Sequence, residues 1–258
     1  MTAPLQALLF DVDGTLADTE DAHRQAFNQA FRDFGFDWTW DMQLYTRLLT
    51  VTGGRARIRH FLETTDRQAL LRDNPDDWIA TLHKRKTDLY VNALNAGGIP
   101  LRPGVRRLLL AARDQGIRLA IATTTTPVNV QALIENTLGA AALDWFDAIG
   151  AGDCVENLKP APDVYLWVLD KLGLPPAACL ALEDSKNGLT AARAAGVKTV
   201  ITYCPYTAGH DFSGAVAVVD GLGEPGRPPH IRLGDRHGKT CVDMELLCRW
   251  HGDRGVAI

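Results

Sequence analysis

The order of short apolar runs and helical patterns constrains the fold of this chain more than any other feature. Apolar runs of strand length occur at 5–10, 117–123, 178–183 and 198–203, and a weaker one at 215–220. Amphipathic helical patterns separate them, and runs that are apolar on both faces are typical of parallel strands covered by helices. The sequence therefore predicts an α/β fold with a doubly wound, mostly parallel, Rossmann-like sheet.

Between residues 19 and 96 the strand pattern is absent and long helical patterns replace it. The chain is thus expected to form two domains. One is a sheet core from 1–18 and 97–258, with 221–258 as a C-terminal extension, and the other is a helical cap at 19–96. Open α/β sheets bind ligands at the carboxyl ends of their strands, where a segment inserted after the first strand must lie. The cap is therefore placed like a lid.

Two helices of the predicted core have clear end signals, and the tail has few. A Pro-Gly pair begins the helical pattern at 103–116, and Ser185 is the expected N-cap of a helix that stops at Gly196. Gly, Pro and charged residues dominate 221–238, so we expect an irregular surface segment before a final helix at 242–251.

The composition excludes several kinds of partner. A formal net charge of −4 and a pI near 6.0 give no field that would collect nucleic acid or an anionic membrane surface. The N-terminal apolar run is too short for a signal peptide or a membrane span. The odd number of cysteines, without a C-x-x-C pair, indicates reduced thiols and a cytoplasmic protein, for which a monomer is plausible. The cysteines are Cys154, Cys179, Cys204, Cys241 and Cys248.

The stretch LFDVDGTLADTE places Asp11 and Asp13 directly after the first apolar run. Residues i and i+2 of an extended chain point to the same side, so both carboxylates can face one reacting group. One carboxylate can attack a phosphoryl group to form an aspartyl-phosphate, while the other transfers the proton. The attacked group is itself anionic, so this chemistry requires a cation, and Mg²⁺ suits carboxylate and carbonyl ligands.

Three further polar stretches accompany the predicted strand ends. Glu183 and Asp184 can supply metal ligands, and the threonines at 123–126 offer hydroxyl and N–H groups to phosphoryl oxygens. Lys159 precedes two prolines in a stiff loop and offers a positive charge. Each stretch alone has a plain structural explanation as a cap, a solvated charge or a loop. Their joint place at the carboxyl edge of the sheet favours an active site.

The stretches FDVDGTLADTE, ATTTT, KPAPD and LEDSKNG, in this order, resemble the four motifs of the haloacid dehalogenase-like phosphohydrolase superfamily. The resemblance covers residues 5 to about 203 and implies a Mg²⁺-dependent phosphatase. It implies that Asp11 is the nucleophile and Asp13 the general acid/base, and that Thr123 and Lys159 bind the transferring phosphoryl group.

The same resemblance implies the metal site and the type of reaction. Mg²⁺ would be held by Asp11, the carbonyl of Asp13 and Asp184, with Glu183 acting through the water shell of the metal. True dehalogenases of the superfamily lack an acid at the position of Asp13, so its presence favours phosphate chemistry.

Basic residues gather in two stretches of the predicted cap, TGGRARIRH (52–60) and HKRKTDLY (83–90), although residues 19–96 carry 11 Lys/Arg and 11 Asp/Glu. If the cap closes over the core, such residues can grip a second anionic group, which indicates a bisphosphate or another phosphate-bearing sugar. The plain alternative is a solvated helix face with i,i+4 pairs. The residues concerned are Arg55, Arg57, Arg59, Lys84, Arg85 and Lys86.

More narrowly, DVDGTLADTEDAHRQAFN, FDWTWDMQLY, TGGRARIRHF and LALEDSKNGL resemble the CbbY family, whose members dephosphorylate xylulose 1,5-bisphosphate, an inhibitor of Rubisco. Arg55 stands where relatives commonly have Lys, and an arginine there can bind phosphate with two nitrogens. His23 and Tyr45 also have plain explanations as packing residues. The implied substrate contacts are Glu20, His23, Tyr45, Gly53, Gly54, Arg55, Arg57 and Lys86, and the threonine run adds Thr124 and Thr125.

Two other functions stay open on the sequence. A β-phosphoglucomutase-like phosphotransferase shares the four motifs and a similar cap, and motif spacing does not separate water from a sugar hydroxyl as acceptor. A non-catalytic phosphate-sensing protein, similar in topology to receiver domains, also places an aspartate at a strand end, but Asp13 argues against it. The sequence does not determine the ranking of sugar phosphates or the purpose of 221–258.

Overall fold

The computed structural model describes residues 3–71 and 73–252. A seven-stranded sheet lies at its centre, in the order β3-β2-β1-β4-β5-β6-β7. Each pairing from β3 to β6 is parallel, whereas β7 runs antiparallel to β6. The strands are β1 Ala7–Phe10, β2 Arg118–Ala122, β3 Phe146–Gly150, β4 Cys179–Glu183, β5 Lys198–Thr202, β6 Ala217–Val219 and β7 Ile231–Leu233.

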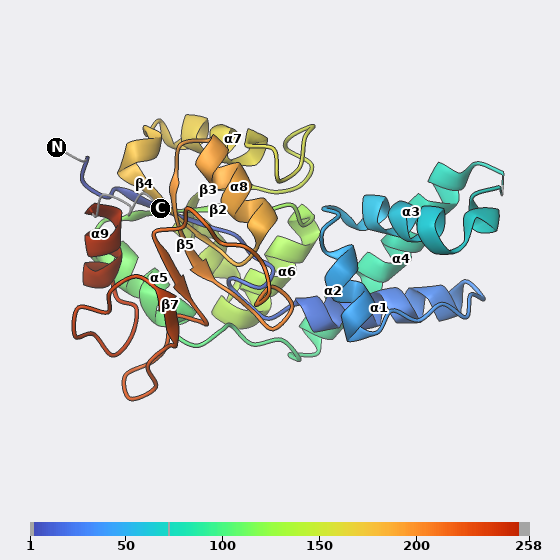
Figure 1. Cartoon of the computed structure of the whole chain (residues 1–258), viewed down its shortest axis with the longest axis horizontal. Coiled ribbons are helices and arrows are strands. Elements are labelled where there is room, and N and C mark those ends of the chain that lie inside the picture. The colour runs from blue at the N-terminus through green and yellow to red at the C-terminus, as the bar shows by residue number, and fades with distance from the viewer. Residues whose placement is uncertain (1–2, 72, 253–258) are drawn as a thin grey trace.

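Helices cover both faces of this sheet (Figure 1). Apolar side chains of α5, α6 and α9 pack in one buried cluster with β1, and those of α7 and α8 pack in a second cluster with the alternate residues of the same strand. The predicted doubly wound α/β fold is confirmed. The helices of the core are α5 Val105–Asp114, α6 Pro127–Leu138, η2 Ala140–Trp145, α7 Asp163–Leu172, η3 Pro176–Ala178, α8 Lys186–Ala194 and α9 Met244–Gly252.

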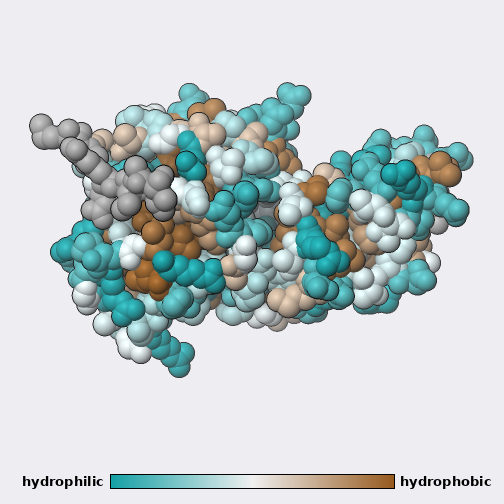
Figure 2. Space-filling view, in the orientation of Figure 1, coloured by the Kyte–Doolittle hydropathy of each residue, from teal (hydrophilic) through white to brown (hydrophobic). Residues whose placement is uncertain are grey.

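The remaining helices form a helical insert, residues 20–95, between β1 and β2. Its aromatic side chains build a separate apolar cluster around Phe27, Phe31 and Trp40, to which Cys204 and Tyr206 of the core contribute. Figure 1 shows the insert beside the sheet, and the outline in Figure 2 is notched between the two parts. The helices are α1 Glu20–Asp33, α2 Met42–Leu48, α3 Gly54–Thr65, η1 Arg67–Leu71 and α4 Pro75–Asn95.

The two chain segments that connect the insert to the core lie side by side. Ala17 pairs with Leu101 in an isolated antiparallel bridge, and the N–H of Arg102 donates to the carbonyl of Leu16 at 2.9 Å. The buried guanidinium of Arg102 donates to carbonyl oxygens of the core at Thr202, Tyr203 and Asp220 and to that of Gly14, and it pairs with Asp18. This one side chain joins both connections to the sheet.

Two strands and the tail differ from the sequence prediction. The edge strand β3 was not predicted, because the exposed Asp147 interrupts its apolar run. The tail was predicted as irregular up to the last helix, yet Ile231–Leu233 forms β7 on the edge of the sheet. The predicted N-cap is confirmed, since Ser185 Oγ accepts from the N–H of Gly188 at 3.1 Å.

Within the described residues, no helix is long and apolar enough to cross a membrane. All five cysteines are free thiols, as their spacing predicted.

Candidate active site

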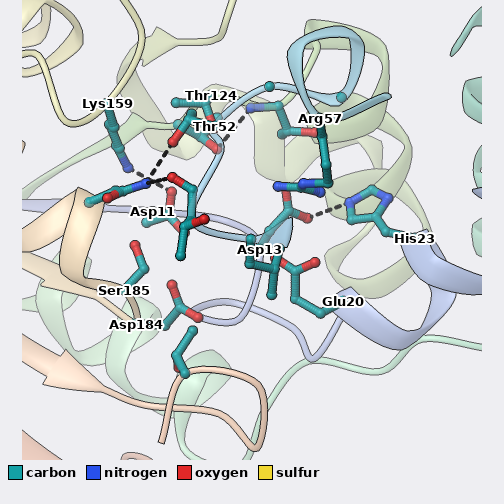
Figure 3. A pocket seen from close by; sticks show the side chains of 18 of the residues that line it. Asp11, Asp13, Glu20, His23, Thr52, Arg57, Thr124, Lys159, Asp184 and Ser185 are labelled. Carbon is teal, nitrogen blue, oxygen red and sulfur yellow. Dashed lines mark hydrogen bonds and ion pairs between the residues drawn. The ribbon is translucent and has the colours of Figure 1, made fainter. Parts of the chain in front are cut away.

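The carboxyl ends of two neighbouring strands bring the predicted acidic residues together. Asp11 follows β1, and Glu183 and Asp184 stand at the end of β4, which pairs with β1. One carboxylate oxygen from each of the three buried residues lies within 4.8 Å of the others. The expected convergence of Asp11 and Asp184 at one place is therefore met, and Figure 3 shows both side chains at the same end of the pocket.

Lys159 is the cation of this acidic cluster. Its Nζ donates to Asp11 Oδ1 at 2.7 Å, to Glu183 Oε1 at 2.5 Å and to the carbonyl oxygen of Ala122 at 2.8 Å. The hydroxyl of Tyr165 donates to the same Glu183 oxygen at 2.5 Å. An ammonium has three protons to donate, and in the free site these three contacts use all of them.

The cluster has more negative charge than Lys159 can balance. Burial raises the pKa of Asp11 from 3.8 to about 7, against the opposing effect of Lys159, and nearby Glu183 raises it further. Burial also raises the pKa of Asp184 well above its usual value, with added repulsion from Asp11 and Glu183. Among the described residues, Glu183 Oε2 is buried without a hydrogen-bond partner. Carboxylates that repel each other in this way fit a hard divalent cation as their missing partner.

Two glycines allow the acidic side chains to approach the backbone. A Cβ on Gly14 would lie 2.2 Å from Asp184 Oδ2, and the positive φ of 79° at Gly14 also disfavours a side chain. A Cβ on Gly188 would lie 1.8 Å from Glu183 Oε2. The glycines of the DGT and SKNG stretches are therefore part of the site geometry.

Asp13 lies apart from the acidic cluster and faces the helical insert (Figure 3). Its Oδ1 accepts from Thr19 Oγ1 at 2.6 Å and lies 3.0 Å from His23 Nε2. His23 Nδ1 lies 2.7 Å from Lys86 Nζ. An ammonium can only donate, so Nδ1 accepts and Nε2–H donates to Asp13. This assignment fixes one tautomer of the neutral His23 ring.

The pKa values of this chain of groups follow from the same contacts. Burial alone would raise the pKa of Asp13, but His23, Thr19 and Lys86 favour the carboxylate and hold that pKa below its usual range. Burial and the positive charge of Lys86 lower the pKa of His23. Burial also lowers the pKa of Lys86 from 10.5 to about 8. In the free site Asp13 is therefore an ionised carboxylate.

The threonine run after β2 lines the pocket beside Asp11. Thr123 is buried, and its Oγ1 accepts from the N–H of Thr125 at 3.3 Å. The Thr125 hydroxyl in turn accepts from Asn129 Nδ2 at 2.9 Å. The run thus presents ordered polar groups at the start of α6, as its sequence predicted: Thr123, Thr124, Thr125 and Thr126 all line the pocket.

The opposite wall of the pocket comes from the helical insert. The predicted substrate contacts that line it are Glu20, His23, Gly53, Gly54, Arg57 and Lys86. Tyr45 does not line the pocket; it is fully buried behind that wall, where its hydroxyl donates to Glu20 Oε2 at 2.9 Å and accepts from Arg57 Nη1 at 3.0 Å. Arg55 is exposed and lies outside the lining.

The two basic stretches do not act as whole clusters, and for three of their six arginines and lysines the alternative of surface ion pairs holds. Arg59 pairs with Asp76, Lys84 pairs with Asp88 at 2.9 Å, and Arg85 pairs with Asp33 at 2.7 Å on the outer surface. Successive residues of a helix point about 100° apart, so one arginine or lysine of each stretch faces the pocket. These residues are Arg57 and Lys86.

Sequence reasoning missed several residues of the pocket. His83 lies one helical turn before Lys86 on α4, and the helical period that places Lys86 could have found it. Asn187 crosses from the core to the insert, because its Nδ2 donates to Thr52 Oγ1 at 2.9 Å. No local pattern marks such a contact between distant segments. The missed lining residues include Phe27, Thr52, His83, Asn129, Lys186, Asn187, Thr207 and His210.

Comparisons with known proteins agree with this geometry. The model of the haloacid dehalogenase-like hydrolase family matches residues 5–196. A CbbY protein of Cupriavidus necator is 49% identical over 251 residues, covering 96% of this chain and 97% of that protein. The chain belongs to the CbbY family of haloacid dehalogenase-like hydrolases. A CbbY protein of Rhodobacter capsulatus is 53% identical over 212 residues, covering 82% of this chain and 91% of that protein.

A solved CbbY structure is also similar. It is a variant of the protein from Rhodobacter sphaeroides in complex with xylulose 1,5-bisphosphate, with 44% identity and a TM-score of 0.78. The match covers 84% of this chain and 94% of that chain. Membership of the CbbY family identifies this chain as a phosphatase of the haloacid dehalogenase-like type. Such hydrolases generally use a divalent metal, which the buried acidic cluster fits.

Proposed function

We propose that this chain hydrolyses a sugar bisphosphate with the help of Mg²⁺, and that xylulose 1,5-bisphosphate is its substrate. The observation that carries the proposal is a single pocket with a buried acidic cluster on the core side and basic side chains on the insert side. A sugar with one reacting phosphate and one remote phosphate matches this division of charge. The CbbY protein of Rhodobacter sphaeroides, solved with xylulose 1,5-bisphosphate, supports the choice of sugar.

In the proposed reaction Asp11 attacks phosphorus and forms an aspartyl-phosphate, while the bond from phosphorus to the sugar oxygen breaks. Asp13 gives its proton to that leaving oxygen and later takes a proton from the water that hydrolyses the intermediate. Lys159 and Thr123 bind the phosphoryl oxygens, and Lys159 also orients Asp11 through its 2.7 Å contact to Oδ1. Free phosphate and the sugar monophosphate are the products.

The acid role of Asp13 depends on the bound substrate. In the free site its pKa lies below its usual range, so it carries no proton. A phosphoryl group next to Asp13 adds negative charge, which raises the pKa of a carboxyl group. Substrate binding thus moves Asp13 toward the protonated form that the first step requires, and departure of the sugar leaves it as the base for the second step.

The proposed Mg²⁺ ligands are Asp11, Asp184 and the backbone carbonyl of Asp13, with Glu183 acting through metal-bound water. When bound, Mg²⁺ neutralises the repulsion between Asp11 and the phosphoryl group. The chain itself prepares the site, because Gly14 lets Asp184 approach the DGT turn and Lys159 bonds both Asp11 and Glu183.

The helical insert is proposed to be a cap domain. It comprises residues 19–96 and closes on a core formed by 1–18 and 97–258. Support comes from its separate apolar cluster and from its contacts to the core at Asn187 and Tyr206, the latter donating to Asp21 at 2.7 Å. Closure excludes water from the aspartyl-phosphate until the leaving sugar has departed.

Phosphate release across a panel of sugar mono- and bisphosphates tests the proposal. With Mg²⁺ present, we expect kcat/KM for xylulose 1,5-bisphosphate to exceed that for glucose phosphates by at least about 100-fold, as two phosphate sites predict. Equal turnover of unrelated monophosphates would contradict the proposed substrate. Conversion of β-glucose 1-phosphate to its isomer without phosphate release would instead indicate a mutase.

A further inference from the structure

His83 lines the pocket but has no role in the proposed reaction. It lies on α4 one turn before Lys86, and both residues line the pocket. The two side chains border the same ring, because the His83 ring centroid is 6.5 Å from that of Phe27 and Lys86 Nζ is 4.9 Å from it. His83 thus extends the basic wall of the pocket away from Asp13.

The start of α3 leaves room for the His83 ring. A Cβ on Gly54 would lie 2.2 Å from His83 Nε2 and 2.5 Å from its Cδ2. Gly53, the N-cap of α3, has no side chain to accept the first N–H groups of that helix. Within the described chain, neither ring nitrogen of His83 has a hydrogen-bond partner. The ring edge is therefore available to a ligand that lies beside Gly54.

The groups facing His83 are mainly basic. They come from α1, α3 and α4, and burial together with Lys86, Arg55, His23 and Arg57 lowers the pKa of His83 from 6.5 to about 3. The neighbouring carboxylates are already engaged, since Glu20 accepts from Tyr45 and Asp13 is bonded to His23. His83 is neutral at neutral pH, and among the described residues neither Arg57 nor Lys86 forms an ion pair with a carboxylate, although Asp13 and Glu20 lie near Lys86.

We propose that His83 binds the remote phosphate of a bisphosphate substrate and takes up a proton when that phosphate enters the pocket. The inference rests on the proposed function, to which it adds a specificity residue. A phosphate between the ring and the cations attracts the proton of an imidazolium, and a charge-assisted hydrogen bond follows. Binding is then linked to proton uptake, so affinity for the bisphosphate falls as pH rises through the pKa of the bound state.

Steady-state kinetics of His83→Phe provide the first test. We expect KM for xylulose 1,5-bisphosphate to rise about tenfold or more, the usual effect of losing a hydrogen bond to a charged group, with kcat within about twofold. Either xylulose 1-phosphate or xylulose 5-phosphate lacks the remote phosphate. KM for that monophosphate should be unchanged in His83→Phe. His60→Phe on α3, outside the pocket lining, is the matched control.

Calorimetry provides a second test that does not depend on turnover. Asp11→Asn protein is titrated with xylulose 1,5-bisphosphate in two buffers of different ionisation enthalpy, and the difference gives the number of protons taken up. The additional change His83→Phe should reduce that number. His83→Gln, which can donate a hydrogen bond but cannot take up a proton, should lose the proton uptake while keeping more of the affinity.

Two results would overturn the inference. One is an active His83→Phe variant whose KM for the bisphosphate is unchanged, and the other is equal proton uptake with and without His83. Circular dichroism and the Tm of each variant show whether it is folded. A wild-type chain that releases no phosphate from any sugar bisphosphate contradicts the proposed function instead. The calorimetric comparison then still decides the role of His83, because loss of binding or of proton uptake is measured on the Asp11→Asn protein.

Discussion

The two walls of the pocket bury side chains of opposite charge. On the core wall, Asp11, Glu183 and Asp184 are buried together with Lys159 as their cation. On the insert wall, Arg57 and Lys86 are joined by histidines that burial keeps neutral. The core wall carries more negative charge than Lys159 balances and fits a metal ion, whereas the basic groups of the insert wall fit an anionic group of the substrate.

Asp13 belongs to the boundary between these walls. Its backbone lies in the core loop after β1, yet its carboxylate is bonded to Thr19 and to His23 of the insert. The group proposed to transfer protons is therefore oriented by the part of the molecule that is proposed to bind the remote phosphate. This comparison predicts that changes on the core wall affect kcat most and changes on the insert wall affect KM most.

The largest effect is expected from Asp11→Asn. Loss of the nucleophile should reduce kcat for phosphate release by at least about 10³-fold. In metal-free protein at pH 8 the same change should raise the Tm, because a carboxylate whose pKa is raised to about 7 costs stability when it is ionised. Thermal unfolding and phosphate release measure both effects. Asp144→Asn, at an exposed position, is the control, and appreciable turnover in Asp11→Asn would contradict the assignment.

Removal of divalent metal comes next. Treatment with a chelator should lower phosphate release by at least about 100-fold, since such an ion contributes several kcal/mol to the reaction. Adding Mg²⁺ back should restore activity and raise the Tm of the wild type, because a ligand of the folded state stabilises it. Asp184→Asn should lose this rise in Tm. Full activity after treatment with the chelator would contradict the proposed metal site on the core wall.

A smaller effect is expected on the insert wall. Arg57→Met should raise KM for the bisphosphate about tenfold and change kcat much less, because a charge-assisted contact to the remote phosphate is lost. Arg59→Met is a matched control two residues along α3, since Arg59 pairs with Asp76 outside the pocket. Equal effects of the two variants would show that the insert wall does not recognise the substrate.

The smallest effect is expected on the pH dependence of the free energy of unfolding. Asp11 on the core wall and His83 on the insert wall change it in opposite directions. As pH falls through about 7, folded Asp11 takes up a proton that the unfolded chain, with a pKa of 3.8, does not, so stability rises. As pH falls below 6.5, the unfolded chain protonates His83 while the folded chain, with a pKa of about 3, does not, so stability falls. Each contribution is at most about 1.4 kcal/mol per pH unit.

Denaturant unfolding of metal-free protein between pH 5 and 8 separates the two contributions. Asp11→Asn should remove part of the rise in unfolding free energy at low pH, to which Asp184 also contributes, and His83→Phe should remove part of the fall. A pH profile that neither variant alters would contradict the charge assignment of both walls.

Much of the sheet core could be predicted because its signals are local. The apolar runs before Asp11 and Glu183 identified β1 and β4, and the pairing of these strands then placed the acidic residues together. The edge strand β3 lacks such a signal, because the exposed Asp147 interrupts its apolar run. The strand β7 lies in a Gly- and Pro-rich segment, where pairing with β6 rather than intrinsic preference determines the structure.

The insert wall was harder to predict, because the direction of a side chain depends on helix rotation and on distant partners. The runs RARIRH and HKRK were interpreted as clusters, but Arg85 points to Asp33 of another helix while Lys86 points to His23. Tyr45 was expected at the substrate and instead lies behind Arg57 and Glu20. Asn187 could not have been found, since its partner Thr52 is 135 residues away in sequence.

Arg102 sets a practical limit on exchanging helical inserts between members of the CbbY family. Its guanidinium is bonded to core carbonyls at Thr202, Tyr203 and Asp220 and also to that of Gly14, which directly follows Asp13. A chimera joined after Asp18 and before Gly97 keeps this arginine with all of its acceptors. A chimera joined downstream of Arg102 imports a foreign residue at that position and leaves four inward-facing backbone oxygens to find new donors.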